Sequence, residues 1–99
     1  MICMEGMNIV EVVPGDIVLS AAGRDKDNFF VVMTVSENYA YLCDGRKRKT
    51  DRQKLKKLKH LKTGIGHSEY IARKIAAGEK VTNAELRREL SEYFMEEDV

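Results

Sequence analysis

The sequence predicts a small, mainly β fold: a strongly bent barrel of about five antiparallel strands, followed by a C-terminal helical hairpin. Three observations lead to this fold class. Five short strand-like segments, separated by turn residues, lie within about fifty residues. From Gly64 onwards the strand pattern stops and apolar residues recur at helical spacing. The length of 99 residues and the hydrophobic fraction of 43% suit one small domain with a modest core.

The chain divides into three expected regions, namely an N-terminal arm (1–11), a barrel (12–62) and a C-terminal helical appendage (63–99). The first strand follows a turn, because Pro14 favours an extended backbone before it and Gly15 permits a bend after it. Residues 17–21 are short and apolar, and we predict the first strand there. Residues 23–28 have no apolar side chain, so we expect a loop that leads into an antiparallel partner.

The strongest strand signal is FFVVMTV, residues 29–35, which is rich in aromatic and β-branched residues. Side chains alternate along a strand, so its two faces can be separated. One face carries Phe29, Val31, Met33 and Val35, and the other carries Phe30 and Val32. Both faces are apolar, and we therefore expect this strand to be covered on both sides.

A third strand is predicted over residues 39–43, after a turn at residues 36–38. Asp44-Gly45 then indicates a tight two-residue hairpin turn, since glycine reaches positive φ cheaply. Further on, leucines at positions 55, 58 and 61 predict a helical or 3₁₀ turn and a short closing strand through residues 58–61. We expect these three leucines to anchor their segment to the core.

The C-terminal part begins with an expected linker over residues 63–67. Ser68 is a suitable N-cap for a helix over residues 69–77, and Gly78 is placed to end it. A second helix is expected after Thr82, because Thr82 and Glu85 match the capping box. Its apolar face carries Leu86, Leu90, Tyr93 and Phe94.

Charge is distributed very unevenly along the chain. The basic segment, residues 46–62, holds ten of the 17 Lys and Arg residues and a single acid, Asp51, giving a net charge of +9. The other 82 residues hold seven bases and 15 acids, a net charge of −8, so the overall charge of +1 conceals a polarised molecule. Such a field favours a polyanion, and nucleic acid is the commonest extended one. A solvated face is the alternative interpretation of a charge run.

Several short motifs resemble a known family. VPGDIV (13–18) and GRDK (23–26), followed by an apolar strand, resemble the KOW motif of SH3-like barrels in ribosomal proteins and transcription elongation factors. Asp44-Gly45 followed by Lys/Arg, and LKHL (58–61), resemble more specifically bacterial KOW-domain proteins, which are similar to large-subunit ribosomal proteins of archaea and eukaryotes. The resemblance covers residues 12–62 and implies an SH3-like barrel that binds RNA in a ribosomal or ribosome-associated setting.

One position departs from the family pattern. Asp27 follows Lys26, where the motif usually has glycine. Aspartate and asparagine tolerate positive φ better than most residues, so we expect the turn to survive. The loop nevertheless loses the closest backbone approach to a phosphate and gains a charge that repels one.

The candidate RNA-binding residues are the cations of the basic segment, with two from the preceding loop and one histidine. They are Arg24, Lys26, Arg46, Lys47, Arg48, Lys49, Arg52, Lys54, Lys56, Lys57, Lys59, His60 and Lys62. We expect them to point outward from the barrel and to bind phosphates, so that structured RNA is preferred through its shape.

Little in the sequence predicts catalysis, metal binding or a cofactor. His60 and His67 have no neighbouring nucleophile and base in the sequence, so we expect no enzyme. Asp25 and Asp27 are better explained as turn formers and ion pairs beside Arg24 and Lys26 than as metal ligands.

The sequence also indicates where the protein is found. Cys3 and Cys43 belong to no CxxC or Cys/His cluster, which mildly favours a reducing compartment. The N-terminus is interrupted by Glu5 and Glu11 and lacks the basic region of a signal peptide. No apolar run approaches the roughly 20 residues of a membrane span. We expect a cytoplasmic protein that does not associate with membranes.

Two further interpretations are kept. The helices and the apolar barrel surface could dock a protein partner, with the basic segment meeting an acidic protein. The two helices could instead form a helix-turn-helix that binds duplex DNA, but residues 82–94 carry a net charge of −1, which opposes groove entry. We expect instead that the helices pack on the barrel, with Arg88 paired to Glu85 and Glu92 on the surface.

Overall fold

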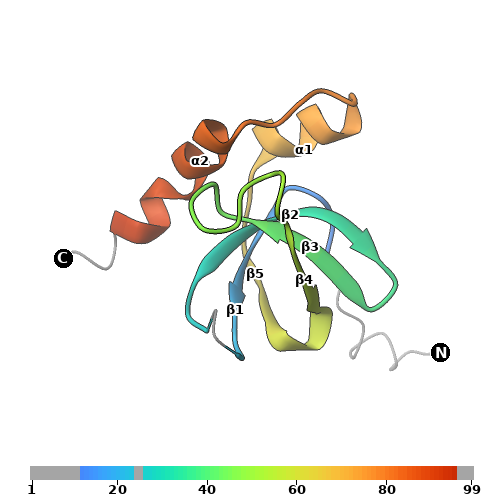
Figure 1. The fold of residues 1–99 in the computed structure, drawn as a ribbon, viewed down its shortest axis with the longest axis vertical. Coiled ribbons are helices and arrows are strands. Elements are labelled where there is room, and N and C mark those ends of the chain that lie inside the picture. The colour runs from blue at the N-terminus through green and yellow to red at the C-terminus, as the bar shows by residue number, and fades with distance from the viewer. Residues whose placement is uncertain (1–11, 24–25, 96–99) are drawn as a thin grey trace.

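The computed structural model describes residues 12–23 and 26–95, with side chains up to Tyr93 at the C-terminal end. The expected arm over residues 1–11, Arg24 and Asp25 therefore lie outside the described residues. The elements are β1 (Asp16–Ser20), β2 (Phe29–Ser36), β3 (Tyr39–Cys43), β4 (Lys54–Lys57), a 3₁₀ turn η2 (Leu58–His60), β5 (Leu61–His67), α1 (Glu69–Ala76) and α2 (Asn83–Met95). The prediction of a mainly β fold with two C-terminal helices is confirmed (Figure 1).

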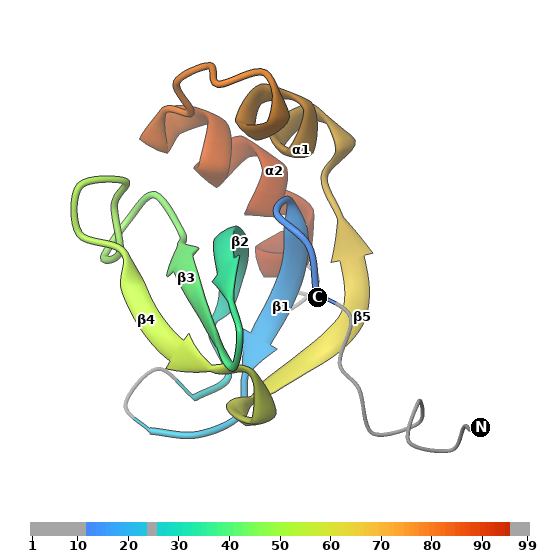
Figure 2. The same cartoon turned by 90° about the vertical axis from the view of Figure 1, so that its right-hand side faces the viewer.

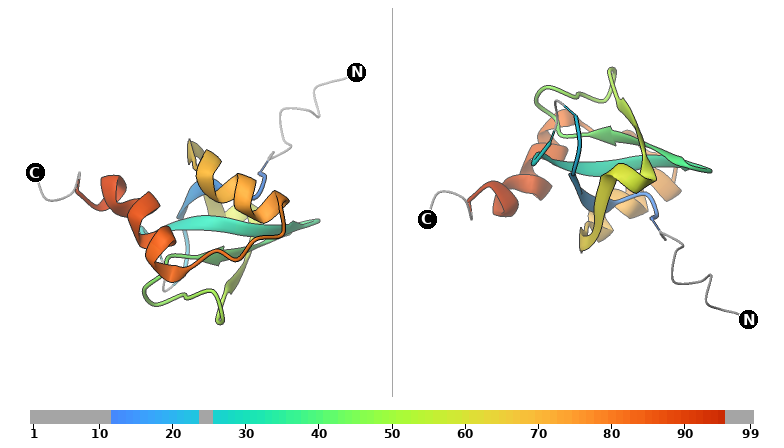
Figure 3. Two further views of the ribbon diagram at one scale, coloured as in Figure 1. Left: turned by 90° about the horizontal axis from the view of Figure 1, so that it is seen from above. Right: turned by 90° about the horizontal axis from the view of Figure 1, so that it is seen from below.

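The five strands form one antiparallel sheet in the order β4-β3-β2-β1-β5. The sheet is open, because β4 and β5 stand at its two ends. These end strands are consecutive in the chain and are joined by η2, so the sheet curls around one side (Figure 2). The two helices lie across the opposite end from η2 (Figure 1, Figure 3).

Two hydrophobic clusters lie on the two faces of the sheet. The helix-facing cluster joins the strands to both helices and contains Ile17, Val31, Met33, Cys43, Ile71, Val81, Leu86 and Leu90. The inner cluster lies within the curl of the sheet and contains Val12, Val18, Phe30, Val32, Ala40, Leu42 and Leu61. Because β2 contributes to both clusters, the expectation that it is covered on both faces is confirmed.

Val35 does not lie on the face that strict alternation assigns to it. It packs against the inner cluster rather than beside Val31 and Met33. The pairing of β2 with β3 shifts register between Val32 and Thr34. A bulge of this kind adds a residue to one strand, and every later side chain then changes face.

The predicted tight turn at Asp44-Gly45 is wrong. Residues 44–53 form a ten-residue connection, called here the β3–β4 loop, before β4 begins at Lys54. Gly45 does take positive φ, +79°. The side chain of Asp44, however, binds the backbone of the residues that follow, and the chain wraps around it instead of returning at once as a strand.

The three leucines of the basic segment have three different environments. Leu61 is buried in the inner cluster and Leu58 is partly buried against it. Leu55 is 47% exposed, so its predicted role as a core anchor is wrong. It pairs with Tyr41, on the opposite face of β4 from the inner cluster. The predicted 3₁₀ turn begins only at Leu58.

The expected linker over residues 63–67 is also wrong, because β5 runs from Leu61 to His67. Its pairing with β1 shifts register between Ile17 and Leu19, opposite the extra β5 residues. Gly64 takes φ +75° there. The glycines that suggest a linker in the sequence are therefore part of a bulged edge strand.

Both helices begin as predicted. The Ser68 hydroxyl accepts a hydrogen bond from the Ile71 amide at 3.1 Å. Thr82 and Glu85 form the reciprocal capping box, with bonds of 2.9 and 3.2 Å. α1 ends just before Gly78, at φ +75°. These bonds satisfy amides that a helix itself leaves without partners.

The helices pack closely on the sheet. A Cβ atom added at Gly15 would lie 2.7 Å from the Ala72 Cβ of α1, and one at Gly45 would lie 2.5 Å from the Asn83 carbonyl oxygen. Ile71, Leu86 and Leu90 are fully buried. The described apolar side chains on these faces of the two helices therefore pack within the chain, as we expected for a hairpin packed on the strands, whereas the side chain of Phe94 lies outside the described residues.

Candidate nucleic-acid interface

The basic segment is distributed over three structural parts. The β3–β4 loop carries Arg46, Lys47, Arg48, Lys49 and Arg52; β4 carries Lys54, Lys56 and Lys57; η2 and β5 carry Lys59, His60 and Lys62. Seven of these eleven side chains are exposed, and Arg48, Lys54, Lys56 and His60 are half-buried.

The β3–β4 loop is organised by Asp44. Its Oδ1 atom accepts hydrogen bonds from the amides of Arg46 (2.8 Å) and Arg48 (2.9 Å), and its own amide donates to the Arg48 carbonyl (2.9 Å). Asp44 is only 8% exposed. One acid of the cationic loop, Asp44, is thus turned inward, whereas Asp51 of the same loop is exposed.

The same loop is attached to the start of α2. Arg87 Nη1 donates to the Gly45 carbonyl at 2.7 Å, and the Thr50 amide donates to Asn83 Oδ1 at 2.9 Å. These bonds join positions 42 and 33 residues apart in the chain. The loop cations consequently extend from a backbone that is held at both ends of the loop.

The lysines of β4 do not all point outward, contrary to expectation. Lys54 pairs with Leu42 and Lys56 with Ala40, so both stand on the face of the inner cluster. Lys56 Nζ donates to the Ala22 carbonyl at 2.7 Å and ties β4 to the β1–β2 loop. Lys57 pairs with the exposed Tyr39 on the outer face. Successive side chains of a strand point to opposite faces, so the cations of β4 are divided between the two faces of the sheet. The net charge of the segment does not show this division.

A second basic group gathers at the η2 end of the sheet. The Ala21 amide donates to the His60 carbonyl at 2.9 Å, and the Leu58 amide donates to the Asn38 carbonyl at 2.8 Å. η2 therefore lies between the β1–β2 loop and the β2–β3 turn. Exposed Lys59 and exposed Lys26 are at this end, whereas the position of Arg24 lies outside the described residues.

The β1–β2 turn adopts the conformation expected despite its missing glycine. Asp27 takes φ +72°, and its amide donates to the Ser20 carbonyl at 2.7 Å. Lys62, by contrast, pairs with Leu19 in the strand pair at the other end of the sheet order from β4. The structure thus does not bring Lys62 onto the same strand pair as Lys57.

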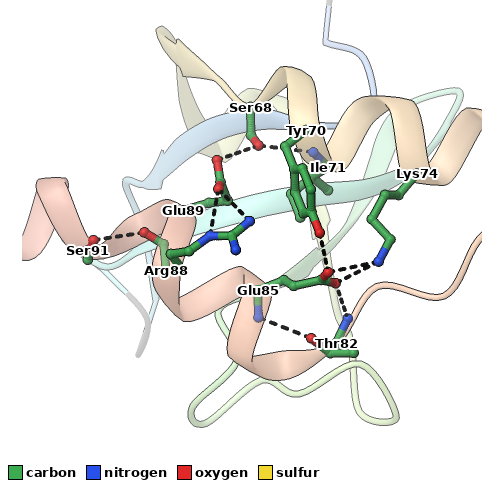
Figure 4. A network of polar contacts seen from close by, with 9 residues as sticks. All are labelled: Ser68, Tyr70, Ile71, Lys74, Thr82, Glu85, Arg88, Glu89 and Ser91. Carbon is green, nitrogen blue, oxygen red and sulfur yellow. Dashed lines mark hydrogen bonds and ion pairs between the residues drawn. The ribbon is translucent and has the colours of Figure 1, made fainter.

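A polar network centred on Glu85 joins α1 to α2 (Figure 4). The Glu85 carboxylate accepts hydrogen bonds from Lys74 Nζ (2.8 and 3.0 Å), the Tyr70 hydroxyl (2.5 Å) and the Thr82 amide (2.9 Å). Lys74 first, then Tyr70 and Thr82, lower the pKa of Glu85 from 4.5 to about 2. In return, the bond to Glu85 raises the pKa of Lys74.

Arg88 is engaged differently from the prediction. It pairs with Glu89, with Nε and Oε2 3.3 Å apart, and its guanidinium lies 4.6 Å from the centre of the Tyr70 ring. The predicted pairing with Glu85 and Glu92 is wrong, because Glu85 is occupied by α1. Arg87 donates to the β3–β4 loop, so both arginines of α2 have contacts within the chain. This arrangement gives no support to a helix-turn-helix.

The outer face of β3 and β4 holds a group that charge and periodicity did not single out. Tyr39 and Tyr41 are 38% and 37% exposed, beside Leu55 and Lys57 of β4. Near Tyr41, whose partner is Thr34, a cleft of about 340 Å³ opens between β2, the β3–β4 loop and residues 78–81. The sequence signal that could have identified this face is the spacing of Tyr39 and Tyr41 two residues apart on a predicted strand, which places both rings on one side of it.

Groups that could support catalysis are sparse among residues 12–23 and 26–93. His67 Nδ1 lies 2.6 Å from Asp16 Oδ1, a contact between residues 51 positions apart that sequence reasoning missed. The adjacent Ser68 hydroxyl donates to Glu89 (2.8 Å) and caps α1, so it is occupied structurally. Burial, followed by Asp44 and Asp51, raises the pKa of the Cys43 thiol to about 12, which disfavours a thiolate nucleophile.

In the described part of the chain, no three His, Cys, Asp or Glu side chains gather closely enough to hold a metal ion. Neither of the described helices has the length and apolar character needed to cross a membrane.

A comparison with models of known protein families finds no match, and a comparison with curated proteins finds none either.

Proposed function

We propose that this chain is a non-catalytic, cytoplasmic RNA-binding module that contacts phosphates through the cations of the basic segment. The observation that carries the proposal is the β3–β4 loop. Its backbone is held by Asp44, Asn83 and Arg87, while Lys47, Lys49 and Arg52 are exposed. A disordered cationic arm would need none of these bonds, so an ordered basic surface argues for recognition of a fixed array of phosphates.

The fold is compatible with the family resemblance. We infer an SH3-like barrel of the KOW type, supported by the five-stranded order and by the 3₁₀ turn between the last two strands. Asp27 retains the left-handed turn at the position of the missing glycine. On this basis the preferred RNA is ribosomal or otherwise structured, and the setting is the ribosome or a ribosome-associated particle.

The proposal predicts the salt dependence of binding. Five exposed cations, Lys47, Lys49, Arg52, Lys57 and Lys59, are suited to phosphate contact. At about 0.7 to 0.9 counterions released per phosphate, log Kd should change with log salt with a slope of roughly 3.5 to 4.5. Affinity for an RNA hairpin, measured by fluorescence anisotropy between about 50 and 200 mM salt, tests this value. An affinity that stays flat over this range would exclude the mechanism.

A matched pair of arginines gives the control. Arg52 lies in the β3–β4 loop and Arg73 on α1, and both side chains are exposed. Arg52→Gln should weaken binding to unrelated RNAs about equally and reduce the salt slope by roughly 0.7 to 0.9, while Arg73→Gln should change neither. Equal effects of the two substitutions would show that only overall charge matters.

Two rival functions make different predictions. A protein-interaction adaptor is favoured by the exposed apolar side chains of β3 and β4, and its partners should remain bound after nuclease treatment of a lysate. A duplex-DNA-binding factor should bind DNA at least as tightly as RNA of the same sequence. Sedimentation of a lysate at low and high salt tests whether the chain travels with ribosomal particles.

A further inference from the structure

The outer face of β3 and β4 concentrates exposed apolar surface at one place. We call Tyr39, Tyr41, Leu55 and Lys57 the tyrosine face; in the pairing of β3 with β4, Tyr39 stands opposite Lys57 and Tyr41 opposite Leu55. Three of the six large hydrophobic side chains that are exposed in the described part of the chain belong to it. Clustered exposure of this kind marks an interaction site more often than scattered exposure does.

The tyrosine face lies on the side of the sheet that the two helices cover elsewhere. Cys43, two residues beyond Tyr41 on the same face of β3, is buried in the helix-facing cluster. Coverage by the helices ends near Met33 and Val81, which line the cleft of about 340 Å³ beside Thr34. The tyrosines thus lie on a strand that is paired on both sides, near the cleft and outside the hydrophobic clusters.

The spacing of the two rings suits bases that are not stacked on each other. Residues at i and i+2 of a strand are about 7 Å apart. This is about twice the 3.4 Å rise of a stacked nucleic-acid strand. Two neighbouring bases can therefore each meet one tyrosine ring only if they are splayed, as they are in unpaired RNA.

The polar side chains of the cleft and the surrounding charges indicate where the bases and phosphates of a bound RNA strand would lie. Thr34, Thr50 and Gln53 line the cleft with side chains able to hydrogen-bond the edge of a base. Lys57 flanks Tyr39, and Thr50 and Gln53 belong to the same loop as exposed Lys49 and Arg52. Glu79 and Lys80 line the cleft with opposite charges, and Glu37 lies in the β2–β3 turn. On the β4 and loop side, exposed Lys49, Arg52 and Lys57 outnumber exposed Asp51, so the phosphates are favoured there.

We propose that the tyrosine face is a stacking platform for unpaired RNA, on which Tyr39 and Tyr41 each receive one base and the adjoining cleft receives the next. This inference rests on the proposed function and deepens it, because phosphate contacts alone do not distinguish paired from unpaired RNA. The cationic flanks favour RNA over an apolar protein partner at the same face.

The test compares two RNA probes and two double variants. Kd is measured by anisotropy for a 12-nucleotide oligouridylate and for an RNA hairpin whose two strands are joined by a non-nucleotide linker, so that every base is paired, each at several salt concentrations. Tyr39→Leu with Tyr41→Leu removes both rings but keeps apolar bulk, and Tyr39→Phe with Tyr41→Phe keeps both rings. Since the chain has four tyrosines and no tryptophan, quenching of tyrosine fluorescence by oligouridylate reports stacking directly in the unmodified protein.

Loss of one stacked base weakens binding about 5- to 140-fold, so the double leucine variant should lose at least about 25-fold for oligouridylate. Its Kd for the hairpin and both salt slopes should be unchanged, and the phenylalanine variant should bind both probes like the original chain. Oligouridylate should also quench the fluorescence of the original chain.

Other results overturn the inference. If the leucine variant keeps its oligouridylate affinity while hairpin binding retains its salt slope, the platform is wrong and the phosphate mechanism stands. If neither probe binds, both proposals fail. A dimer of the original chain that the leucine variant abolishes would assign the face to a second copy. Should the leucine variant not fold, absent quenching in the original chain is sufficient to reject stacking.

Discussion

Gly45→Ala tests whether α2 positions the cationic loop. Gly45 has φ +79°, and an added Cβ would lie 2.5 Å from the Asn83 carbonyl oxygen, a backbone atom that cannot easily move aside. The methyl group should push the loop away from the start of α2. That displacement breaks the Thr50–Asn83 and Arg87–Gly45 hydrogen bonds.

The expected size of the effect has two parts. A non-glycine residue in the left-handed region costs about 1–2 kcal/mol. Loss of two hydrogen bonds adds about 0.5–1.5 kcal/mol each. The free energy of unfolding of Gly45→Ala should therefore fall by about 2–5 kcal/mol.

Gly78→Ala is the matched control. Gly78 has φ +75°, almost the same as Gly45, but an added Cβ would have no atom within 4 Å. It should therefore show only the backbone cost of about 1–2 kcal/mol. The effect of glycine removal on the unfolded chain is the same in both variants and cancels in the comparison.

Urea unfolding gives the two free energies, and anisotropy gives the hairpin affinity at fixed salt. Gly45→Ala should be less stable than Gly78→Ala by about 1–3 kcal/mol and should bind the paired hairpin more weakly. Gly78→Ala should bind this probe normally, because Gly78 borders only the cleft that we assign to an unpaired base. Equal stability of the two variants would refute the proposed contact between loop and helix. Normal RNA binding by a destabilised Gly45→Ala would refute the role of that contact in presenting the cations.

Three further predictions concern the core, the helix network and the buried thiol. Leu90→Ala should lower the free energy of unfolding by about 2–5 kcal/mol, because Leu90 is fully buried. Leu55→Ala, at a 47% exposed site, should change this free energy by no more than about 0.5 kcal/mol. Similar losses for the two variants in urea unfolding would contradict the burial pattern. The pKa of Glu85 is lowered from 4.5 to about 2, so the stabilisation by its carboxylate is complete above pH 4.5 and is lost as the pH falls from 4.5 to 2. The difference in unfolding free energy between the original chain and Glu85→Gln should therefore shrink over that range. A difference that stays constant with pH would disprove the network. In a variant with Cys3 replaced by serine, Cys43 should react with iodoacetamide at pH 8 roughly a thousandfold more slowly in the folded than in the unfolded protein, because the pKa of its thiol is about 12 in the folded state. Comparable rates in the two states would contradict the burial of Cys43.

Features that depend on neighbouring residues were predictable. The cap at Ser68 and the capping box at Thr82 each join residues three positions apart, so the sequence contains both partners of every bond. The third strand was predicted with its observed bounds, Tyr39–Cys43, because alternating apolar residues and flanking turns identify it locally. Positive φ at Asp27 likewise follows from the intrinsic tolerance of aspartate.

Features that depend on distant partners were missed. The sequence predicts a tight turn in place of the β3–β4 loop because the partners of that loop, Asn83 and Arg87, lie 33 and 42 residues away. The glycines of residues 63–67 predict a linker, because the sequence of this segment does not show that it pairs with β1 as part of β5. The Asp16–His67 contact spans 51 residues and has no local signal.

Composition and short-range periodicity are sufficient to predict the mainly β fold, the two helices and the concentration of positive charge in residues 46–62. The directions in which those charges point depend on contacts between distant segments. Strand pairing turns Lys56 to the inner face and Lys57 to the outer face, and the bonds to α2 hold the loop cations. A side chain's direction depends on the register of its strand against other strands, and register is a property of the assembled sheet.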